Sequence, residues 1–494
     1  MNLAIGVVDV AVLVTYLIAT ILFGLWLGRG QRDLSSYLLG DRNLPWWAIL
    51  ISIVSTETSA ATFLSVPGLA FKANGGDMRF LQLAAGYIVG RLLIVRILLP
   101  LYFKGQLFTA YEVLNQRFGV ATKQAASIVF LIPRNLSDGL RLFLLAIVLE
   151  EVVGLPLPAC VVIMGIAVTL YTLFGGMKSV IWNDCVQFAI YVLGGVVAAA
   201  ILLSVKLPGG WGQFVDFATQ HGKLRVCEFT FDLKENLTFW SGLVGGMFLT
   251  LGTHGTDQMM VQRYLCARSR GDAGLALALS GLVVFVQFAF FLFIGILLAC
   301  FYNEVQPQTF AKTDRVFAVF IVNELPKNVG LVGLVLAAVF SAAMSTSLNS
   351  SAACVVNDLV LPRKQARGDG FSEAEQFRLT KLLIIAFGAV QIALGIGAKF
   401  VSGTVVDNAL AIAGFSAGLL LGLFFLGIFT RVKQASALSG LFGGLLVLTA
   451  AKFLPALAPW VPVLAWPWFP VLGVTATMAS GLAHHYVVGK EDQN

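Results

Sequence analysis

The stretch SIVSTETSAATFLSVP, from Ser52 to Pro67, places serine or threonine at seven positions, and the carboxyl group of Glu57, inside a run otherwise long enough to cross a bilayer. Such hydroxyls can bond the backbone of their own helix, which is the purely structural alternative. A carboxylate at mid-bilayer, however, costs about 2.5–3.5 kcal/mol or more and marks function by default. Irregular backbone at membrane depth must be buried in protein or line a wet cavity. The stretch therefore predicts a helix broken at a functional site, with Pro67 and Gly68 closing the run.

The composition predicts an all-α polytopic membrane protein. Of the 494 residues, 58% are hydrophobic and only 12% are charged, too few to cover a soluble surface. The net charge of +7 predicts membrane orientation and no nucleic-acid binding, because the basic residues mostly lie in short loops on one side. Six cysteines and four histidines show neither metal-ligand spacing nor a disulfide framework. We therefore expect no enzyme activity and no organic cofactor.

Apolar runs of about 20 residues or more predict about thirteen transmembrane spans. Their approximate limits are 6–28, 44–71, 79–103, 124–150, 157–175, 181–205, 237–265, 273–302, 328–361, 378–398, 404–430, 433–453 and 461–488. Loops after odd-numbered spans hold most of the lysine and arginine, as between Arg263 and Arg270. The positive-inside rule therefore places the N-terminus outside and the C-terminus in the cytoplasm, in a plasma membrane or bacterial inner membrane.

A second span is interrupted five spans after the first. Its sequence GLVGGMFLTLGTHGTDQMMVQRY is broken around His254 and Asp257, which would otherwise be helix caps near the membrane interface. Interrupted spans at matching positions of two five-helix units indicate an inverted-repeat transporter with its site at the midplane. We predict the following units: an N-terminal helix and cytoplasmic loop (1–43), a first repeat (44–205), an outer loop (206–236), an inverted second repeat (237–430) and two C-terminal helices (431–494).

Other polar groups inside the predicted spans also have structural alternatives. Asp184 follows GGMKSVIWN, where a carboxylate would equally cap a helix N-terminus. Arg134, Asp138 and Arg141 have the spacing of an internal salt-bridge chain. Arg91 is expected to extend its side chain toward the inner membrane surface. The segment STSLNSS of the ninth span holds more hydroxyls than close helix packing requires.

Six segments, taken in order, resemble the sodium/solute symporter family, which includes sodium/glucose cotransporters, proline permease and bacterial sialic acid symporters. They are SAATFLSVPG, FLQL with GYIVGRLL, YEVLNQRFG, GGMKSVIWNDCVQ, GTDQMMVQRYL and STSLNSS. The resemblance covers nearly the whole chain. It implies a leucine-transporter-like fold with a five-plus-five inverted repeat, in agreement with the two interrupted spans.

The resemblance also implies sodium sites. The family's main site uses backbone carbonyls at positions matching Ser55, Thr58 and Val339, together with two adjacent hydroxyls. This chain has Ala342 and Ala343 at the hydroxyl positions, so the main site lacks two of its ligands here.

A second sodium site, of the sialic acid type, matches Asp184, Ser345 and Thr346, all of which are present. Glu57 matches a coupling aspartate of proline permease. The resemblance therefore leaves three roles for its carboxylate: it replaces the lost sodium ligands, holds a proton or faces the substrate.

The resemblance places substrate contacts at Glu57, Ser59, Thr62, Gln82 and Arg134. An arginine fork binds both oxygens of a carboxylate and keeps its charge. We therefore expect alternating-access symport of sodium with a small polar organic anion such as a sugar acid or sialic acid. A neutral sugar or other polar solute, proton coupling, and a channel or transporter-like sensor are the alternatives. The expected partners are the solute and the lipid bilayer, and the oligomeric state is left open.

Overall fold

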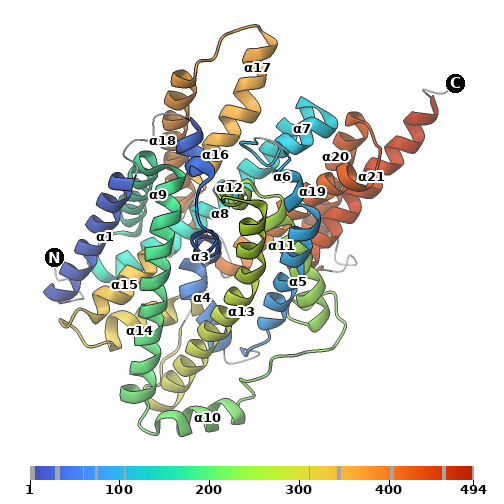
Figure 1. Cartoon of the computed structure of the whole chain (residues 1–494). Helices are drawn as coiled ribbons and strands as arrows, with labels where there is room; N and C mark the ends of the chain where they lie inside the picture. Colours follow the sequence, from blue (N-terminus) through green and yellow to red (C-terminus); the bar gives the residue numbers. More distant parts are fainter. Residues whose placement is uncertain are drawn as a thin grey trace.

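The chain folds into a bundle of helices (Figure 1). The computed structural model describes residues 6–27, 34–58, 60–72, 76–104, 107–310, 312–341, 347–400, 405–458 and 463–491. Within these residues the only strand-like pairing is one isolated bridge between Leu44 and Ala267. The described chain is therefore helical, as the composition predicts.

Helical segments occupy each predicted span. Up to the outer loop they are α1 (Val7–Leu27), α2 (Leu34–Leu39), α3 (Trp46–Glu57), α4 (Ala60–Phe71), α5 (Leu81–Ile97), α6 (Leu99–Tyr102), α7 (Glu112–Phe118), α8 (Val120–Val153) and α9 (Leu157–Ile201). From there they are α10 (Gly210–Gln220), α11 (Gly246–Gly255), α12 (Gln258–Leu265), α13 (Arg270–Cys300), α14 (Val316–Glu324), α15 (Leu331–Ser341), α16 (Leu348–Cys354), α17 (Leu361–Ala366), α18 (Glu373–Gly397), α19 (Val405–Phe429), α20 (Gln434–Leu457) and α21 (Phe469–Glu491). The predicted outer loop thus contains a helix of its own, α10.

Not every spanning helix is apolar. Among the described residues, six helices are long and apolar enough to cross a membrane alone, and the bent pair α3–α4 makes a seventh. The helix α8 is not one of them and carries Lys123, Arg134, Asp138 and Arg141. Lys123 and Asp138 are buried against neighbouring helices. The bundle interior, and not lipid, therefore surrounds these charged groups.

The first interrupted span breaks inside the hydroxyl-rich stretch. Helix α3 ends at Glu57, and the axis bends by 55° into α4. The Thr62 hydroxyl donates to the carbonyl of Glu57 at 3.3 Å, which replaces a bond that the break removes. Pro67 does not close the run as expected, because α4 continues to Phe71. A β-carbon on Gly295 of α13 would lie 2.2 Å from the Pro67 carbonyl oxygen, so α13 packs directly on the backbone there.

The second interrupted span breaks between α11 and α12. The carboxylate of Asp257 accepts a hydrogen bond from the Met259 amide at 2.8 Å and so caps α12. The Tyr264 hydroxyl donates to the carbonyl of His254 at 3.0 Å. Side chains therefore bind backbone groups that the break releases, as an apolar surrounding requires.

The predicted fifth and sixth spans follow one another without a loop. Helix α9 contains both and departs from helical geometry at Gly176, where φ is 58° and ψ is −174°. Glycine adopts a positive φ at little steric cost. Asp184 lies about two turns beyond this break. It is therefore inside a helical segment, and capping does not account for it.

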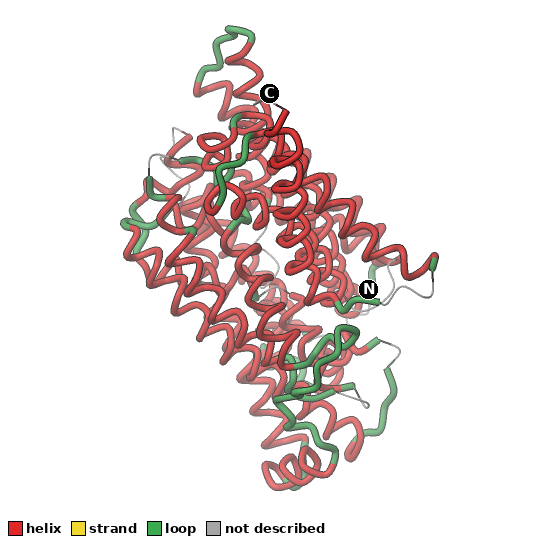
Figure 2. The backbone as a smooth tube through the Cα atoms, turned by 90° about the vertical axis from the view of Figure 1, so that its right-hand side faces the viewer, coloured by secondary structure: helices red, strands yellow, loops and turns green. Residues whose placement is uncertain are grey.

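The two ends of the bundle can be told apart. A salt bridge of 2.9 Å joins Lys206, just before α10, to Glu324 of α14. The Val8 amide donates to the Asn328 side chain beyond α14 at 3.1 Å. Helix α10 and the first residues of α1 thus lie at the same end of the bundle, here called the α10 end. Helices α7 and α17 lie at the opposite end, here called the α17 end (Figure 1). Figure 2 shows that most of the connecting loops gather at these two ends.

Candidate functional site

A cavity of about 120 Å³ is lined by both interrupted spans together with α5, α8, α13 and α19. Most of its wall is apolar and includes Phe80, Leu249 and Phe288. The polar part consists of two arginines, one glutamate, one histidine and four hydroxyl side chains, one of them the phenol of Tyr87. A mostly apolar pocket with a few convergent polar groups is the usual form of a small-molecule site.

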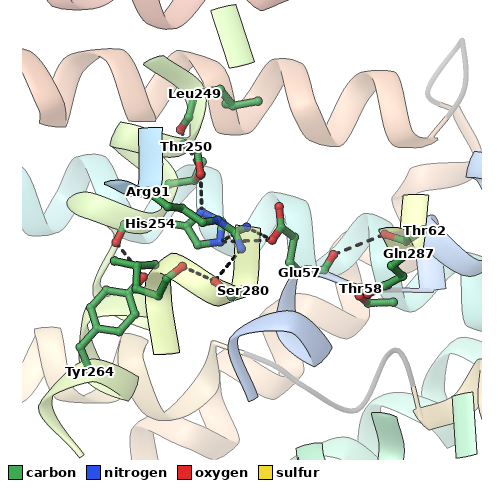
Figure 3. Close-up of polar contacts among 12 residues, drawn as sticks. Glu57, Thr58, Thr62, Arg91, Leu249, Thr250, His254, Tyr264, Ser280 and Gln287 are labelled. Carbon is green, nitrogen blue, oxygen red and sulfur yellow. Dashed lines mark hydrogen bonds and ion pairs between the residues drawn. The ribbon is translucent and has the colours of Figure 1, made fainter. Parts of the chain in front are cut away.

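The carboxylate of Glu57 forms an ion pair with Arg91 of α5 (Figure 3). Nε2 of His254 lies 3.4 Å from the same carboxylate oxygen. Arg91 is fully buried, and it also donates to Ser280 of α13 at 2.7 Å. The expectation that Arg91 reaches the membrane surface is therefore wrong. A carboxylate on another helix neutralises its charge inside the bundle.

His254 is held from both sides of its ring. Nδ1 lies 3.2 Å from the hydroxyl of Thr250 and 3.1 Å from that of Thr253. Nε2 lies 3.2 Å from Nη2 of Arg91. His254 thus joins α11 to the Glu57–Arg91 pair, deep in the bundle and not in a cap at the interface.

Arg134 and Arg141 of α8 share the carboxylate of Asp138. Oδ1 of Asp138 lies 3.1 Å from Arg134 and 3.8 Å from Arg141. Oδ2 accepts hydrogen bonds from the backbone amide and the hydroxyl of Ser347 at 3.0 and 2.6 Å. Both arginines line the central cavity. Arg134 therefore has both the salt bridge of the structural alternative and the cavity position of the predicted substrate contact, and Arg141 lies at the same cavity without having been predicted as a contact.

Arg134 also lines a second, smaller cavity of about 30 Å³. This space includes Thr253 and Asp257, and so it reaches the break between α11 and α12. Ser137, Thr253 and Arg134 belong to both cavities. The Arg134 side chain therefore stands where the two spaces meet.

The other predicted substrate contacts are placed differently. Thr62 lines the central cavity. Gln82 does not, because its amide donates to the Leu237 carbonyl at 3.3 Å and accepts from the Glu228 amide at 3.0 Å. Gln82 thus joins the segment between α10 and α11 to α5. Ser59 lies outside the described residues.

The positions of the family's main sodium site are described only in part. Ser55, Thr58 and Val339 are buried, while Ala342 and Ala343 lie outside the described residues. Gln287 of α13 donates to the Thr58 hydroxyl, on the side of α3 away from Arg91 (Figure 3). The carboxylate of Glu57 faces Arg91 and His254. Among the described residues, its contacts are therefore with these two side chains.

Asp184 is fully buried and bound to α3 and α12. Ser52 donates to Oδ2 at 2.5 Å, and Nη2 of Arg263 lies 3.3 Å from the same oxygen. Ser345 and Thr346, the other positions of the predicted second sodium site, lie outside the described residues.

Among the described residues, two amide side chains on α9 and the neighbouring α16 are buried without hydrogen-bond partners. One is Gln187, one turn beyond Asp184 along α9, and the other is Asn349 of α16, which packs against α9. Buried polar atoms rarely remain unbonded. Amide oxygens are ligands of the kind that a hard cation binds.

Residues 37–444 match the profile of the Sodium:solute symporter family. The chain belongs to this family. Two similar proteins are the sodium/iodide cotransporter of Homo sapiens (28% identity over 89% of this chain and 69% of that protein) and the sodium-dependent multivitamin transporter of Oryctolagus cuniculus (29%, 97% and 72%). Sodium-coupled monocarboxylate transporter 1 of Homo sapiens is 28% identical over 84% of this chain and 68% of its own length.

Solved structures agree with the family assignment. A Na⁺-coupled sialic acid symporter in a substrate-bound outward-open state matches with a TM-score of 0.86 and 26% identity, covering 98% of both chains. Mhp1, a nucleobase-cation-symport-1 family transporter in a closed conformation, matches with a TM-score of 0.59 and 14% identity over 92% of this chain and 94% of its own. The fold is therefore leucine-transporter-like, and this symporter binds a solute within a membrane.

Two functional groups of this symporter were not predicted from sequence. Arg91 was expected at the surface, and Arg263 was counted among the loop residues, yet both are buried partners of carboxylates. The sequence contains one signal for Arg91. Arg91 directly follows Gly90, and Gly86 and Gly90 have the four-residue spacing typical of close helix contacts in membranes. A charge beside such a contact faces protein and not lipid.

Proposed function

We propose that this symporter couples sodium entry to the uptake of a small carboxylate with an apolar body. The observation that carries the proposal is the pair Arg134 and Arg141 on the wall of a small and mostly apolar cavity. Arginine forks bind carboxylates through two parallel hydrogen bonds. An apolar wall suits a short hydrocarbon body better than a sugar ring, whose hydroxyls would each need a partner.

The charges around Asp138 favour an anionic guest. One oxygen of Asp138 is bound to Ser347 and only the other faces the two arginines. Within the described chain, Nε of Arg134 is buried without a hydrogen-bond partner. Two guanidinium groups thus share one carboxylate. A substrate carboxylate would supply the charge and the acceptors that the pair lacks.

The size of the cavity narrows the class of substrate. A group the size of a water molecule needs about 10–15 Å³ of cavity volume, so the cavity of about 120 Å³ holds roughly ten non-hydrogen atoms. A monocarboxylate of a few carbons fits this limit, and a sialic acid exceeds it. The similarity to sodium-coupled monocarboxylate transporters points in the same direction.

The sodium ion would use the region around Asp184, with Ser345 and Thr346 completing the ligands. The carbonyls of Ser55, Thr58 and Val339 would form a main site weakened by Ala342 and Ala343. The two interrupted spans would open the cavity to each side of the membrane in turn. The substrate would enter from the α10 end and leave at the α17 end. In this proposal the N-terminus lies outside a plasma membrane and the C-terminus lies in the cytoplasm.

Uptake into proteoliposomes tests the proposal. Vesicles containing purified protein receive labelled pyruvate under an inward sodium gradient, a pH gradient or neither. We expect saturable, sodium-driven uptake of pyruvate and no uptake of galactose. Galactose uptake without pyruvate uptake would favour the neutral-solute alternative. Uptake that follows pH and ignores sodium would favour proton coupling, and uptake without any gradient dependence would contradict symport.

A further inference from the structure

His254 lies beside a carboxylate–guanidinium pair and lines the central cavity. Its ring lies beside Glu57 and Arg91 on one side and beside Thr250 on the other (Figure 3). The hydroxyl of Thr253 also lies within hydrogen-bond distance of Nδ1. His254 and Glu57 also line the cavity that contains Arg134. Water and solutes in the cavity therefore reach a titratable side chain.

The hydrogen bonds of His254 assign one tautomer. A guanidinium can only donate, so Nε2 accepts from Arg91 at 3.2 Å. The Thr253 hydroxyl donates to the Leu249 carbonyl at 3.0 Å, which leaves it an acceptor for Nδ1–H at 3.1 Å. In this arrangement the ring is neutral, and its proton is on Nδ1.

The same site offers a second arrangement. The Glu57 carboxylate lies 3.4 Å from Nε2 and can accept a hydrogen bond from it. A proton added to Nε2 would end the bond from Arg91, because both groups would then be donors. The new N–H would turn to Glu57 without any movement of the backbone. Arg91 would keep its bond to Ser280 and its ion pair with Glu57.

Several charged or titratable groups surround the ring. They are Glu57 of α3, Arg91 and Tyr87 of α5, Arg134 and Arg141 of α8, and Asp257 and Tyr264 beyond the end of α11. The cavity residues from α19 are alanine and leucine and add no charge. A positive ring would lie next to the carboxylate of Glu57 and on the wall of the cavity that an anionic substrate would occupy.

We propose that His254 is a proton-binding site of the transport cavity. The proton comes from cavity water, binds to the lone pair of Nε2 and is released from it when the cavity opens to the other side. The added charge raises the affinity for a carboxylate, so that the proton and the substrate anion bind together. This inference rests on the proposed function in its choice of an anionic substrate.

The first test measures pyruvate binding to the purified protein in sodium by isothermal titration calorimetry at pH 6 and pH 8. Pyruvate stays ionised over this range. We expect the dissociation constant to be about tenfold lower at pH 6, and two buffers of different ionisation enthalpy should reveal proton uptake on binding. H254Q should remove both effects. The control H484Q, at the far end of α21, should keep them.

The second test does not depend on the substrate. Nitrogen NMR of the histidine rings in lipid bilayers, with H254Q to assign the signal, follows protonation of His254 directly. Titration at Nε2 between pH 5 and 8 supports the proton site whether or not pyruvate binds. A failure of pyruvate to bind would contradict only the proposed function. A ring that stays neutral throughout overturns the inference. The inference is also overturned if the affinity of the wild type for pyruvate does not depend on pH. The same holds if H254Q keeps the pH dependence of the wild type.

Discussion

Arg91 carries a full charge in a helix that faces lipid on its other side, and its charge is balanced by Glu57 from a different span. Removing one partner of such a buried pair typically costs about 3–5 kcal/mol, because the remaining charge stays desolvated. The pair therefore fixes the end of α3 against α5. The same logic applies to Asp184 with Arg263, and to Asp138 with its two arginines.

At Arg134, substitution should separate substrate binding from structure. R134A should abolish pyruvate uptake, at a cost of about 2–5 kcal/mol in binding, if the guanidinium holds the carboxylate. The double variant R134A/D138N removes both charges. Because Asp138 still pairs with Arg141 in R134A, the single variant should keep most of its thermal stability, and the double variant should lose stability through the unpaired Arg141 without regaining uptake. Recovery of uptake in the double variant would reduce Arg134 to a structural partner of Asp138.

At Asp184, a charge-removing variant should change sodium dependence. D184N removes a charged oxygen ligand, so the sodium concentration for half-maximal uptake should rise about tenfold or more. This variant leaves Arg263 buried without its carboxylate, so stability is measured alongside. D184N/R263Q balances the charge again. If the double variant regains wild-type sodium dependence, Asp184 is only an ion-pair partner.

At the level of secondary structure, two glycines let α5 pack closely against the second interrupted span. A β-carbon on Gly90 would lie 2.1 Å from the Thr250 side chain and 2.7 Å from the Met247 carbonyl of α11. A β-carbon on Gly86 would lie 2.6 Å from the carbonyl of Gly242. Small residues let helix backbones approach closely in membranes. This approach brings Arg91 within reach of both interrupted spans.

A single methyl group at Gly90 should therefore disturb the site. G90A should lower the melting temperature, corresponding to about 1–3 kcal/mol, and should reduce uptake by pushing α5 and Arg91 away from His254. The matched control is G212A in α10, where no atom lies within 4 Å of an added β-carbon. If G90A and G212A have the same melting temperature and the same uptake, the helices around Gly90 can move apart to accept a methyl group at no cost.

Across the whole molecule, polar contacts join segments at both ends of the bundle. At the α17 end, Asp358 accepts hydrogen bonds from Thr109 and Ser127 and pairs with Lys123 at 3.1 Å. At the α10 end, Lys223 donates to the Lys72 carbonyl at 2.6 Å just beyond α4. Alternating access would require each set of contacts to open in turn.

The orientation of the molecule can be read from one cysteine. Cys227, in the outer loop after α10, is the exposed cysteine among the six, and the others are buried or partly buried. A maleimide that does not cross membranes should label Cys227 in intact cells if the α10 end faces outside. C227S should abolish this labelling. Labelling that requires permeabilised cells would reverse the proposed orientation.

The sequence by itself determined the membrane class, the helical ranges and the two interrupted spans, because apolar run length and local hydroxyl, glycine and charge content act within single segments. It also named Glu57, Thr62 and Arg134, which line the cavity. Only the tertiary structure decided the partners. Arg91 against Glu57 and His254, and Arg263 against Asp184, join spans far apart in the chain. The sequence of one helix does not specify which buried charge on another helix will pair with its own, because the pairing depends on how the helices pack together.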